Sequence, residues 1–362
     1  MTGAASAALA AAPRDRDRNH AGVRAWLYGV AFLIICMVVV GGATRLTNSG
    51  LSITEWQPIH GVIPPMNGAE WQDEFGKYRQ IPEYKLLNPD MTLAEFKGIF
   101  WWEWAHRLLG RVIGIVFLLP LVFFAATGRI ERPLIPKLAG LFVLGGLQGV
   151  VGWWMVASGL IERTDVSQYR LAVHLTLACA LLAAILWVAR GLGSAVVPAA
   201  RGLRTTAGAL VVLVLGQIFL GAIVAGLNAG LVSNTWPLMD GALVPPGLLA
   251  QAPAWTNFFE NPLTAQFDHR LLAYIVFIVA LVQAVRARRT AHAAGALALA
   301  LLVAGQATLG IATVVSGVPL HLAILHQLGA VLVLSLAVIN WRAMVPASKE
   351  GESWTRSAPQ PT

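Results

Sequence analysis

Eight apolar segments, each close to 20 residues or longer, limit what this chain can fold into. They cover approximately residues 24–44, 105–127, 134–158, 170–190, 205–227, 268–286, 293–317 and 323–343. The hydrocarbon core of a bilayer is spanned by about 20 apolar residues of helix, and a helix satisfies its own backbone hydrogen bonds in lipid. We therefore expect an all-α polytopic membrane protein with eight transmembrane helices.

The composition agrees with a membrane protein. Hydrophobic residues make up 57% of the chain and charged residues only 12%, with a mean hydropathy of +0.66, whereas soluble domains carry about a quarter charged residues. The net charge of +8 does not favour a nucleic-acid partner, because the basic residues flank the apolar segments. We interpret Cys36 and Cys179, which lie within apolar runs, as small buried hydrophobic residues and not as a disulfide.

The basic residues of the short connections predict the orientation of the chain. They precede the first segment, occupy every second connection and follow the last segment: Arg14, Arg16, Arg18, Arg24, Arg129, Arg132, Lys137, Arg190, Arg201, Arg204, Arg286, Arg288, Arg289, Arg342 and Lys349. The positive-inside rule then places both termini in the cytoplasm. The connection over residues 48–102 would lie outside. We expect residues 1–23 to be a disordered cytoplasmic tail and residues 346–362 to be a second cytoplasmic tail.

Two halves of the chain resemble each other. Trp102–Gly110 resembles Ala265–Ala273, and Gln148–Gly159 resembles Gln306–Gly317, in the same order. Each half contains four of the apolar segments, so the halves are expected to be parallel repeats. We predict two tandem four-helix bundles, over residues 24–192 and 193–345, related by a pseudo-twofold axis along the membrane normal.

Four histidines occupy matching places near one end of the even-numbered segments: His106, His174, His269 and His326. An ionisable side chain at membrane depth is costly and indicates a functional site. A single such histidine is more often a hydrogen-bond donor between helices, but four in matched positions favour two metal-binding pairs. Two facing imidazoles are the natural axial ligands of a haem iron in a helix bundle. Zinc is less favoured, because catalytic zinc needs three protein ligands together and structural zinc usually recruits cysteine.

A carboxylate distinguishes the two halves. Glu103 lies three residues before His106 on the same helix face, and Gln266 takes its place before His269. This difference predicts a reactive site in the N-terminal half and a plain bis-histidine redox site in the C-terminal half. The alternative is that Glu103 only forms an ion pair with Arg107. Arginines near the same ends are candidate partners for haem propionates or ordinary interfacial anchors: Arg45, Arg107, Arg170 and Arg270.

Several long motifs resemble those of the heme A synthase family, in the branch of alphaproteobacteria and mitochondria. They are Gly41–Trp56, Gly61–Pro65, Phe75–Asn88, Phe100–Arg107, Gln148–Gly159, Val166–Leu175 and His326-Gln327, and the resemblance covers about residues 24–345. It implies an eight-helix oxidoreductase that oxidises the C8 methyl group of haem O to a formyl group, through a hydroxymethyl intermediate. The product is haem A for terminal cytochrome oxidase.

The resemblance also implies roles for individual residues. All four histidines would be axial ligands of haem iron. His106 and His174 would hold the substrate haem O beside the essential Glu103, and these three residues would be catalytic. His269 and His326 would hold haem b, the electron-relay cofactor. One bacterial branch of the family has cysteine pairs in its outer loops. This chain lacks them, so a thiol-based step is not expected.

The same resemblance implies the surroundings of the protein. It would be a multi-pass protein of the bacterial inner membrane, in contact with membrane lipid. Its partners would be haem O synthase, cytochrome oxidase assembly factors and an electron donor, and it leaves room for a homo-oligomer. From the residues alone, two other classes stay open: a dihaem electron-transfer cytochrome, which does not need Glu103, and a haem carrier without chemistry of its own.

Overall fold

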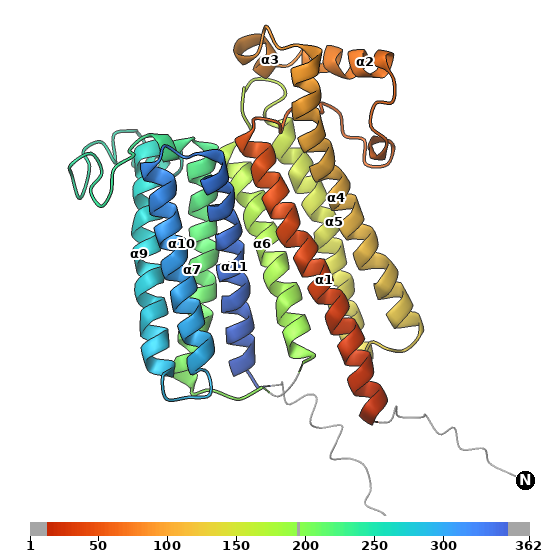
Figure 1. The fold of residues 1–362 in the computed structure, drawn as a ribbon, viewed down its shortest axis with the longest axis vertical. Coiled ribbons are helices and arrows are strands. Elements are labelled where there is room, and N and C mark those ends of the chain that lie inside the picture. Colours follow the sequence, from red (N-terminus) through yellow and green to blue (C-terminus); the bar gives the residue numbers. More distant parts are fainter. Residues whose placement is uncertain (1–12, 194–195, 347–362) are drawn as a thin grey trace, which may run out of the picture.

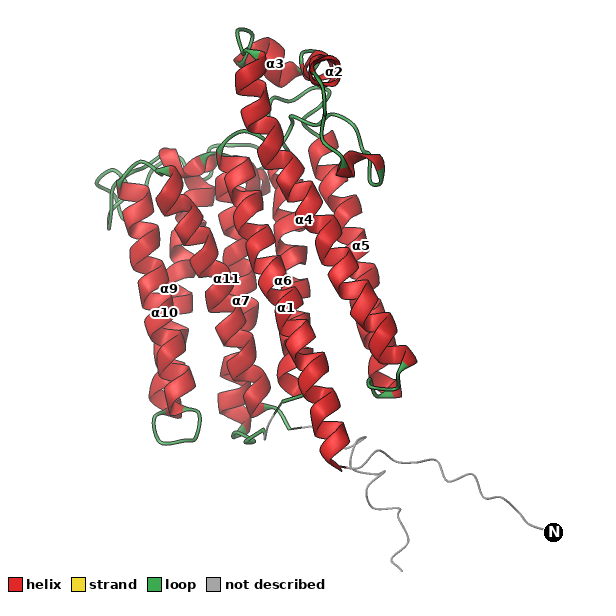
Figure 2. Cartoon of the chain, turned by 45° about the vertical axis from the view of Figure 1, so that its right-hand side comes forward, coloured by secondary structure: helices red, strands yellow, loops and turns green. Residues whose placement is uncertain are grey.

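The computed structural model describes residues 13–193 and 196–346, and in these residues helix is the only regular secondary structure (Figures 1 and 2). The eight long helices are α1 (Pro13–Leu46), α4 (Leu93–Ala126), α5 (Ile135–Ala157), α6 (Gln168–Gly191), α7 (Arg201–Gly226), α9 (Pro262–Ala287), α10 (Ala293–Val315) and α11 (Leu320–Met344). Shorter helices in the connections are α2 (Gly68–Tyr78), α3 (Pro82–Leu87) and α8 (Asn257–Glu260), with 3₁₀ turns at His60–Val62, Arg132–Leu134, Ala229–Leu231 and Ala254–Thr256.

All eight long helices are long and apolar enough to cross a membrane, which confirms the predicted fold class. Their outward faces are apolar as well. Only 6% of the most apolar stretch of α5 is buried within the protein, and only 11% of that of α4. Large side chains such as Leu119, Val143 and Leu147 are exposed there. A helix that is apolar on its outer face as well as its inner face is suited to lipid and not to water.

The long helices form two groups of four. In the N-terminal half α1 contacts α4 and α6, and α5 contacts both α4 and α6; in the C-terminal half α7 contacts α9 and α11, and α10 contacts both α9 and α11. The groups meet where α6 packs on α7 and α11, and where α1 packs on α11 (Figure 1). This neighbour pattern is consistent with tandem four-helix bundles. The pseudo-twofold axis and the division at 192/193, next to residues outside the described ranges, stay predictions.

Residues 68–100, called the cap below, rise above one end of the N-terminal group (Figures 1 and 2). α4 begins at Leu93, twelve residues before the predicted segment at 105, because Thr92 and Glu95 form a capping box that starts the helix early. The cap has its own core of mostly aromatic side chains: Leu51, Trp71, Phe75, Tyr78, Ile81, Phe96, Phe100 and Val166. The connection over residues 48–102 is therefore largely helical.

The chain before the first predicted segment is also more regular than expected. α1 begins at Pro13, so residues 13–23 of the predicted disordered tail are helical. Proline is suited to the first turn of a helix, where its missing N–H costs nothing. Residues 1–12 and 347–362, the rest of the two predicted tails, lie outside the described residues. Cys179 is buried and Cys36 is half-buried; both are free thiols.

Candidate functional site

The four histidines lie at the cap end of the membrane helices. His174, His269 and His326 follow the first residues of α6, α9 and α11 by six or seven positions. His106 lies deeper in its helix, thirteen residues after the start of α4, because α4 extends into the cap. Each helix turns its histidine inward, where the side chain is half-buried.

The two histidines of the C-terminal half face each other. The imidazole rings of His269 and His326 have centroids 6.4 Å apart and planes inclined at 76°. In the N-terminal half His106 on α4 and His174 on α6 occupy the corresponding positions. Among the described residues, no three His, Cys, Asp or Glu side chains gather into a group that could hold a metal ion by itself. The four histidines are therefore distributed two to each half and do not form a closed metal cage.

Each imidazole packs against a glycine on the long helix that precedes its own. A Cβ atom built at Gly41 would lie 2.8 Å from Cε1 of His106; at Gly152, Gly221 and Gly310 the corresponding distances are 2.9, 3.1 and 2.7 Å to the rings of the other three histidines. Real Cβ atoms avoid such distances, so an alanine at any of these positions would displace the ring. The four glycines thus fix how closely each histidine approaches its neighbouring helix.

Three of the imidazoles contact a glutamine amide as well. The Nε2 of Gln148 lies 3.1 Å from Nδ1 of His174, and Gln217 and Gln306 stand at the same distance from Nδ1 of their histidines. Each amide also donates to the backbone carbonyl of its histidine. The Gln217 amide is 3.2 Å from Nε2 of His269 too. The sequence alone did not indicate a role for these glutamines, although Gln148 and Gln306 stand in a repeated motif.

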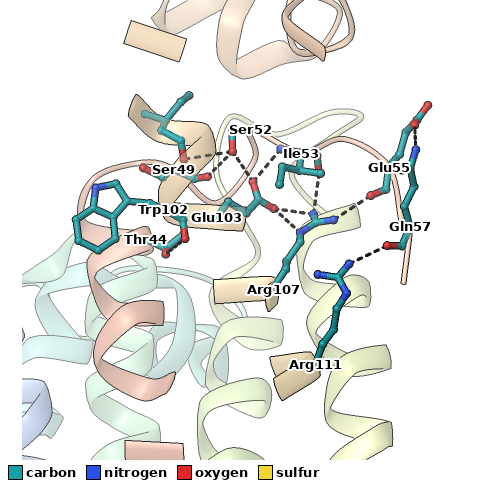
Figure 3. A network of polar contacts seen from close by, with 11 residues as sticks. Thr44, Ser49, Ser52, Ile53, Glu55, Gln57, Trp102, Glu103, Arg107 and Arg111 are labelled. Atoms are coloured by element: carbon teal, nitrogen blue, oxygen red, sulfur yellow. Dashed lines mark hydrogen bonds and ion pairs between the residues drawn. The ribbon is translucent and has the colours of Figure 1, made fainter. Parts of the chain in front are cut away.

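Glu103 is 3% exposed and accepts four hydrogen bonds (Figure 3). Its Oε1 accepts hydrogen bonds from Nη2 of Arg107 at 2.6 Å and from Nε of the same arginine at 3.1 Å. Its Oε2 accepts hydrogen bonds from Ser52 Oγ at 2.7 Å and from the Ile53 N–H at 2.8 Å. The alternative considered for Glu103, an ion pair with Arg107, is thus present. The pair also fixes the loop after α1, because Arg107 donates to the carbonyls of Ile53 and Glu55.

In the C-terminal half, the matching arginine makes the same contacts with loop carbonyls, but the side chain in place of Glu103 makes fewer and longer hydrogen bonds. Arg270 donates to the carbonyls of Ser233 and Thr235, as Arg107 does to two loop carbonyls. Gln266 is also buried, but its Nε2 donates a hydrogen bond to the carbonyl of Ser233. Its Oε1 accepts one from Arg270 at the longer distance of 3.4 Å. The exchange of a carboxylate for an amide therefore changes the charge of the site and leaves the backbone arrangement in place.

Two further arginines at the cap end are engaged by the protein itself. Arg45 forms an ion pair with Asp165 at 3.6 Å and donates to the carbonyl of Ala225. Arg170 donates to the carbonyl of Trp154 at 2.6 Å and lies over its indole ring. Both predicted roles of these arginines, anchoring at the membrane interface and binding of haem propionates, stay predictions.

A second buried carboxylate, Glu83 in α3, escaped the sequence analysis. It is 4% exposed, and its Oε2 has no hydrogen-bond partner within residues 13–193 and 196–346. Burial, followed by the nearby charges of Asp165 and Glu103, raises the pKa of Glu83 to about 8, against small opposing effects of Tyr78 and Arg45. No pattern in the sequence pointed to it, since its burial depends on the aromatic core of the cap.

Comparison with known proteins shows the family to which this chain belongs. The model of the COX15-CtaA family, described as cytochrome oxidase assembly protein, matches residues 24–338. Heme A synthase of Chelativorans sp. is 60% identical over 90% of this chain and 92% of its own length. Those of Mesorhizobium japonicum and Brucella ovis are 58% and 56% identical, over 94% and 91% of this chain and 95% and 93% of their own lengths. The resemblance predicted from the motifs is confirmed, and the chain belongs to the COX15-CtaA family, alongside the heme A synthases of alphaproteobacteria.

Proposed function

We propose that this protein is a heme A synthase, an oxidoreductase that converts haem O to haem A for cytochrome oxidase. Relatives of that name are 55–60% identical over nearly the whole chain. The observation that carries the proposal within the molecule is the pair of unlike sites. Two histidine pairs, one in each half, lie at one end of the long helices, and in the described part of the chain only His106 has a buried carboxylate three residues before it.

The C-terminal pair suits a bound haem b. Imidazole nitrogens bind metal ions at about 2 Å, so two imidazoles that share one metal ion would have ring centres no more than roughly 6 Å apart. The rings of His269 and His326 are 6.4 Å apart. When bound, the haem would supply one-electron redox chemistry. His269 and His326 would hold its iron, and Gly221 and Gly310 would set the positions of the rings.

The N-terminal pair, His106 and His174, would bind the substrate haem O. The reaction oxidises the C8 methyl group to a formyl group through a hydroxymethyl intermediate. The protein would orient this methyl group and control the charge around it. Glu103 would stabilise the positive charge that develops at the methyl carbon, or accept its protons. Its four hydrogen bonds, including two from Arg107, keep the carboxylate in one orientation.

The setting of the enzyme follows from the same proposal. Eight membrane helices make it a multi-pass membrane protein, and we place it in the bacterial inner membrane with both termini in the cytoplasm. Haem O synthase would supply the substrate, assembly factors of cytochrome oxidase would receive the product, and an electron donor would serve the haem b site.

Porphyrin extraction from the purified protein tests the proposal. The protein is purified from cells that make haem O, and the extracted porphyrins are separated on a column. Haem B together with haem O or haem A supports the synthase. Two haem B per chain would indicate an electron-transfer cytochrome instead, and a substoichiometric mixture would indicate a carrier. Either of these results overturns the proposed activity.

A further inference from the structure

The contacts of the four imidazoles differ at one position. Each glycine that supports a histidine ring is preceded, four residues earlier, by a side chain on the same helix face. Before three of the glycines this residue is a glutamine: Gln148 before Gly152, Gln217 before Gly221 and Gln306 before Gly310. Before Gly41, which supports His106, it is Met37.

A glutamine amide can orient an imidazole in either of its neutral forms. Its Nε2 can donate to Nδ1 when that nitrogen carries no proton. Its Oε1 can accept from the Nδ1–H when the other ring nitrogen is bound to a metal. In all three glutamines Oε1 is buried and has no hydrogen-bond partner in the part of the chain that the structure describes. In the structure the same Nε2 also donates to the backbone carbonyl of the histidine and holds the amide beside the ring; for Oε1 to accept from Nδ1–H, the amide turns over and gives up this bond.

Met37 cannot do the same for His106. A thioether has no hydrogen to donate and is a weak acceptor. Its terminal methyl lies 3.3 Å from the position that a Cβ at Gly110 would occupy, one turn beyond His106 on α4. The Nδ1 of His106 is accordingly buried without a hydrogen-bond partner among the described residues. His106 therefore keeps its glycine contact but lacks the polar contact that fixes the other three rings.

We propose that Gln148, Gln217 and Gln306 hold three haem-ligating imidazoles in their binding orientation, and that Met37 leaves His106 free to release the iron. The glutamines and Met37 are then positioning residues that act through the histidines. This inference rests on the proposed function, because it treats the four histidines as haem ligands. Beyond that function, it identifies His106 as the one histidine of the four that dissociates from the haem iron and rebinds.

The difference matches what the two sites must do. A resident haem b is retained through every turnover, and both of its ligands, His269 and His326, are held by glutamines. A substrate haem has to enter and its product has to leave. In the N-terminal site His174 contacts a glutamine and would keep the substrate in position. His106 has no such contact and would be the ligand that leaves the iron. Outer contacts of metal-binding histidines commonly change metal affinity by roughly 10–100-fold.

Binding of carbon monoxide to the reduced protein tests the inference without relying on turnover. Carbon monoxide binds a six-coordinate haem only after an axial histidine has left the iron. In the full-length protein, Met37→Gln should slow its binding to the N-terminal haem roughly 10-fold. Met37→Leu, which stays apolar, is the matched control and should bind at the wild-type rate. Equal rates for Met37→Gln and Met37→Leu would overturn the role of Met37.

The reciprocal experiment uses the C-terminal haem. In a His106→Ala, His174→Ala background only that haem should remain, and Gln217→Met should increase its rate of carbon monoxide binding roughly 10-fold. The control is Gln283→Met, since Gln283 is a buried glutamine of α9, the helix of His269, and donates to the carbonyl of Leu203 and to no histidine of the described residues. Unchanged rates in Gln217→Met, with haem bound, would overturn the inference and leave the proposed function intact. Absence of haem from the background protein would overturn both.

Discussion

Replacing Glu103 by glutamine removes a charge and nearly preserves the shape of the side chain. The carboxylate receives donors on both oxygens: Arg107 on Oε1, and Ser52 and the Ile53 N–H on Oε2. An amide has one oxygen, so its NH₂ group must face one of these two sets of donors. Gln266 shows the resulting arrangement, in which the amide donates to a loop carbonyl and the arginine contact lengthens to 3.4 Å.

The size of two effects follows from these contacts. Hydrogen bonds to charged groups contribute about 1.5–3 kcal/mol each, so losing two of them costs on the order of 3–6 kcal/mol of stability. Loss of a charge-stabilising group at a reacting centre lowers a rate on the order of 100-fold. A loss of stability reduces the amount of folded protein but not the rate per folded molecule, so the two effects can be separated by normalising haem A to haem b.

The assay measures haem A formed per bound haem b in membranes containing the full-length protein, together with the melting temperature in detergent. The control is Glu95→Gln, a shape-preserving change of an exposed carboxylate on the same helix, whose capping box glutamine also supports. Glu103→Gln should lower haem A per haem b about 100-fold and accumulate haem O or its hydroxymethyl form. Near-normal haem A per haem b would refute the catalytic role, and loss of both haems would assign Glu103 a structural role instead.

Three further outcomes are expected. His269→Ala or His326→Ala should remove the haem b absorption spectrum, whereas replacing the exposed His321 should not; an unchanged spectrum in both variants would contradict the C-terminal haem site. Because the folded state raises the pKa of Glu83 from 4.5 to about 8, it binds the proton more tightly, and stability should fall as pH rises between these values. Glu83→Gln should flatten the melting temperature between pH 5 and pH 9 and raise it at pH 9; an equally steep dependence would contradict this. A reporter active only in the periplasm should be silent when fused after Thr362, and a strong signal would reverse the predicted orientation.

The membrane helices were predictable because the bilayer sets one length for all of them and tolerates few charged residues within it. The cap was not predicted, since its structure depends on aromatic contacts in water. A signal for part of it was available. Trp71, Phe75 and Tyr78 recur at intervals of four and three residues, the pattern of an amphipathic helix. Phe96, the partner of Phe75 and Tyr78, lies about twenty residues further along the chain, and no local pattern indicates that contact.

The site was predictable to the extent that its residues are costly in a membrane. Histidines and Glu103 stand out in apolar segments for this reason. The glutamines do not, because an amide at membrane depth often serves only to join helices. Comparison of the two halves does not point to Gln217, because the matching residue in the N-terminal half is Met37 and not a second glutamine. Their common role became visible only through distances to the imidazoles.

The early start of α4 has a mechanical consequence. From Leu93 in the cap to His106 in the membrane the helix runs unbroken for thirteen residues, about 20 Å at 1.5 Å per residue, and contains no proline. A stiff rod of this length carries a push or a tilt at one end directly to the other. His269 sits on a helix that begins only seven residues before it, at Pro262. A movement of the cap is therefore transmitted to the imidazole of His106, which has no glutamine amide to restrain it.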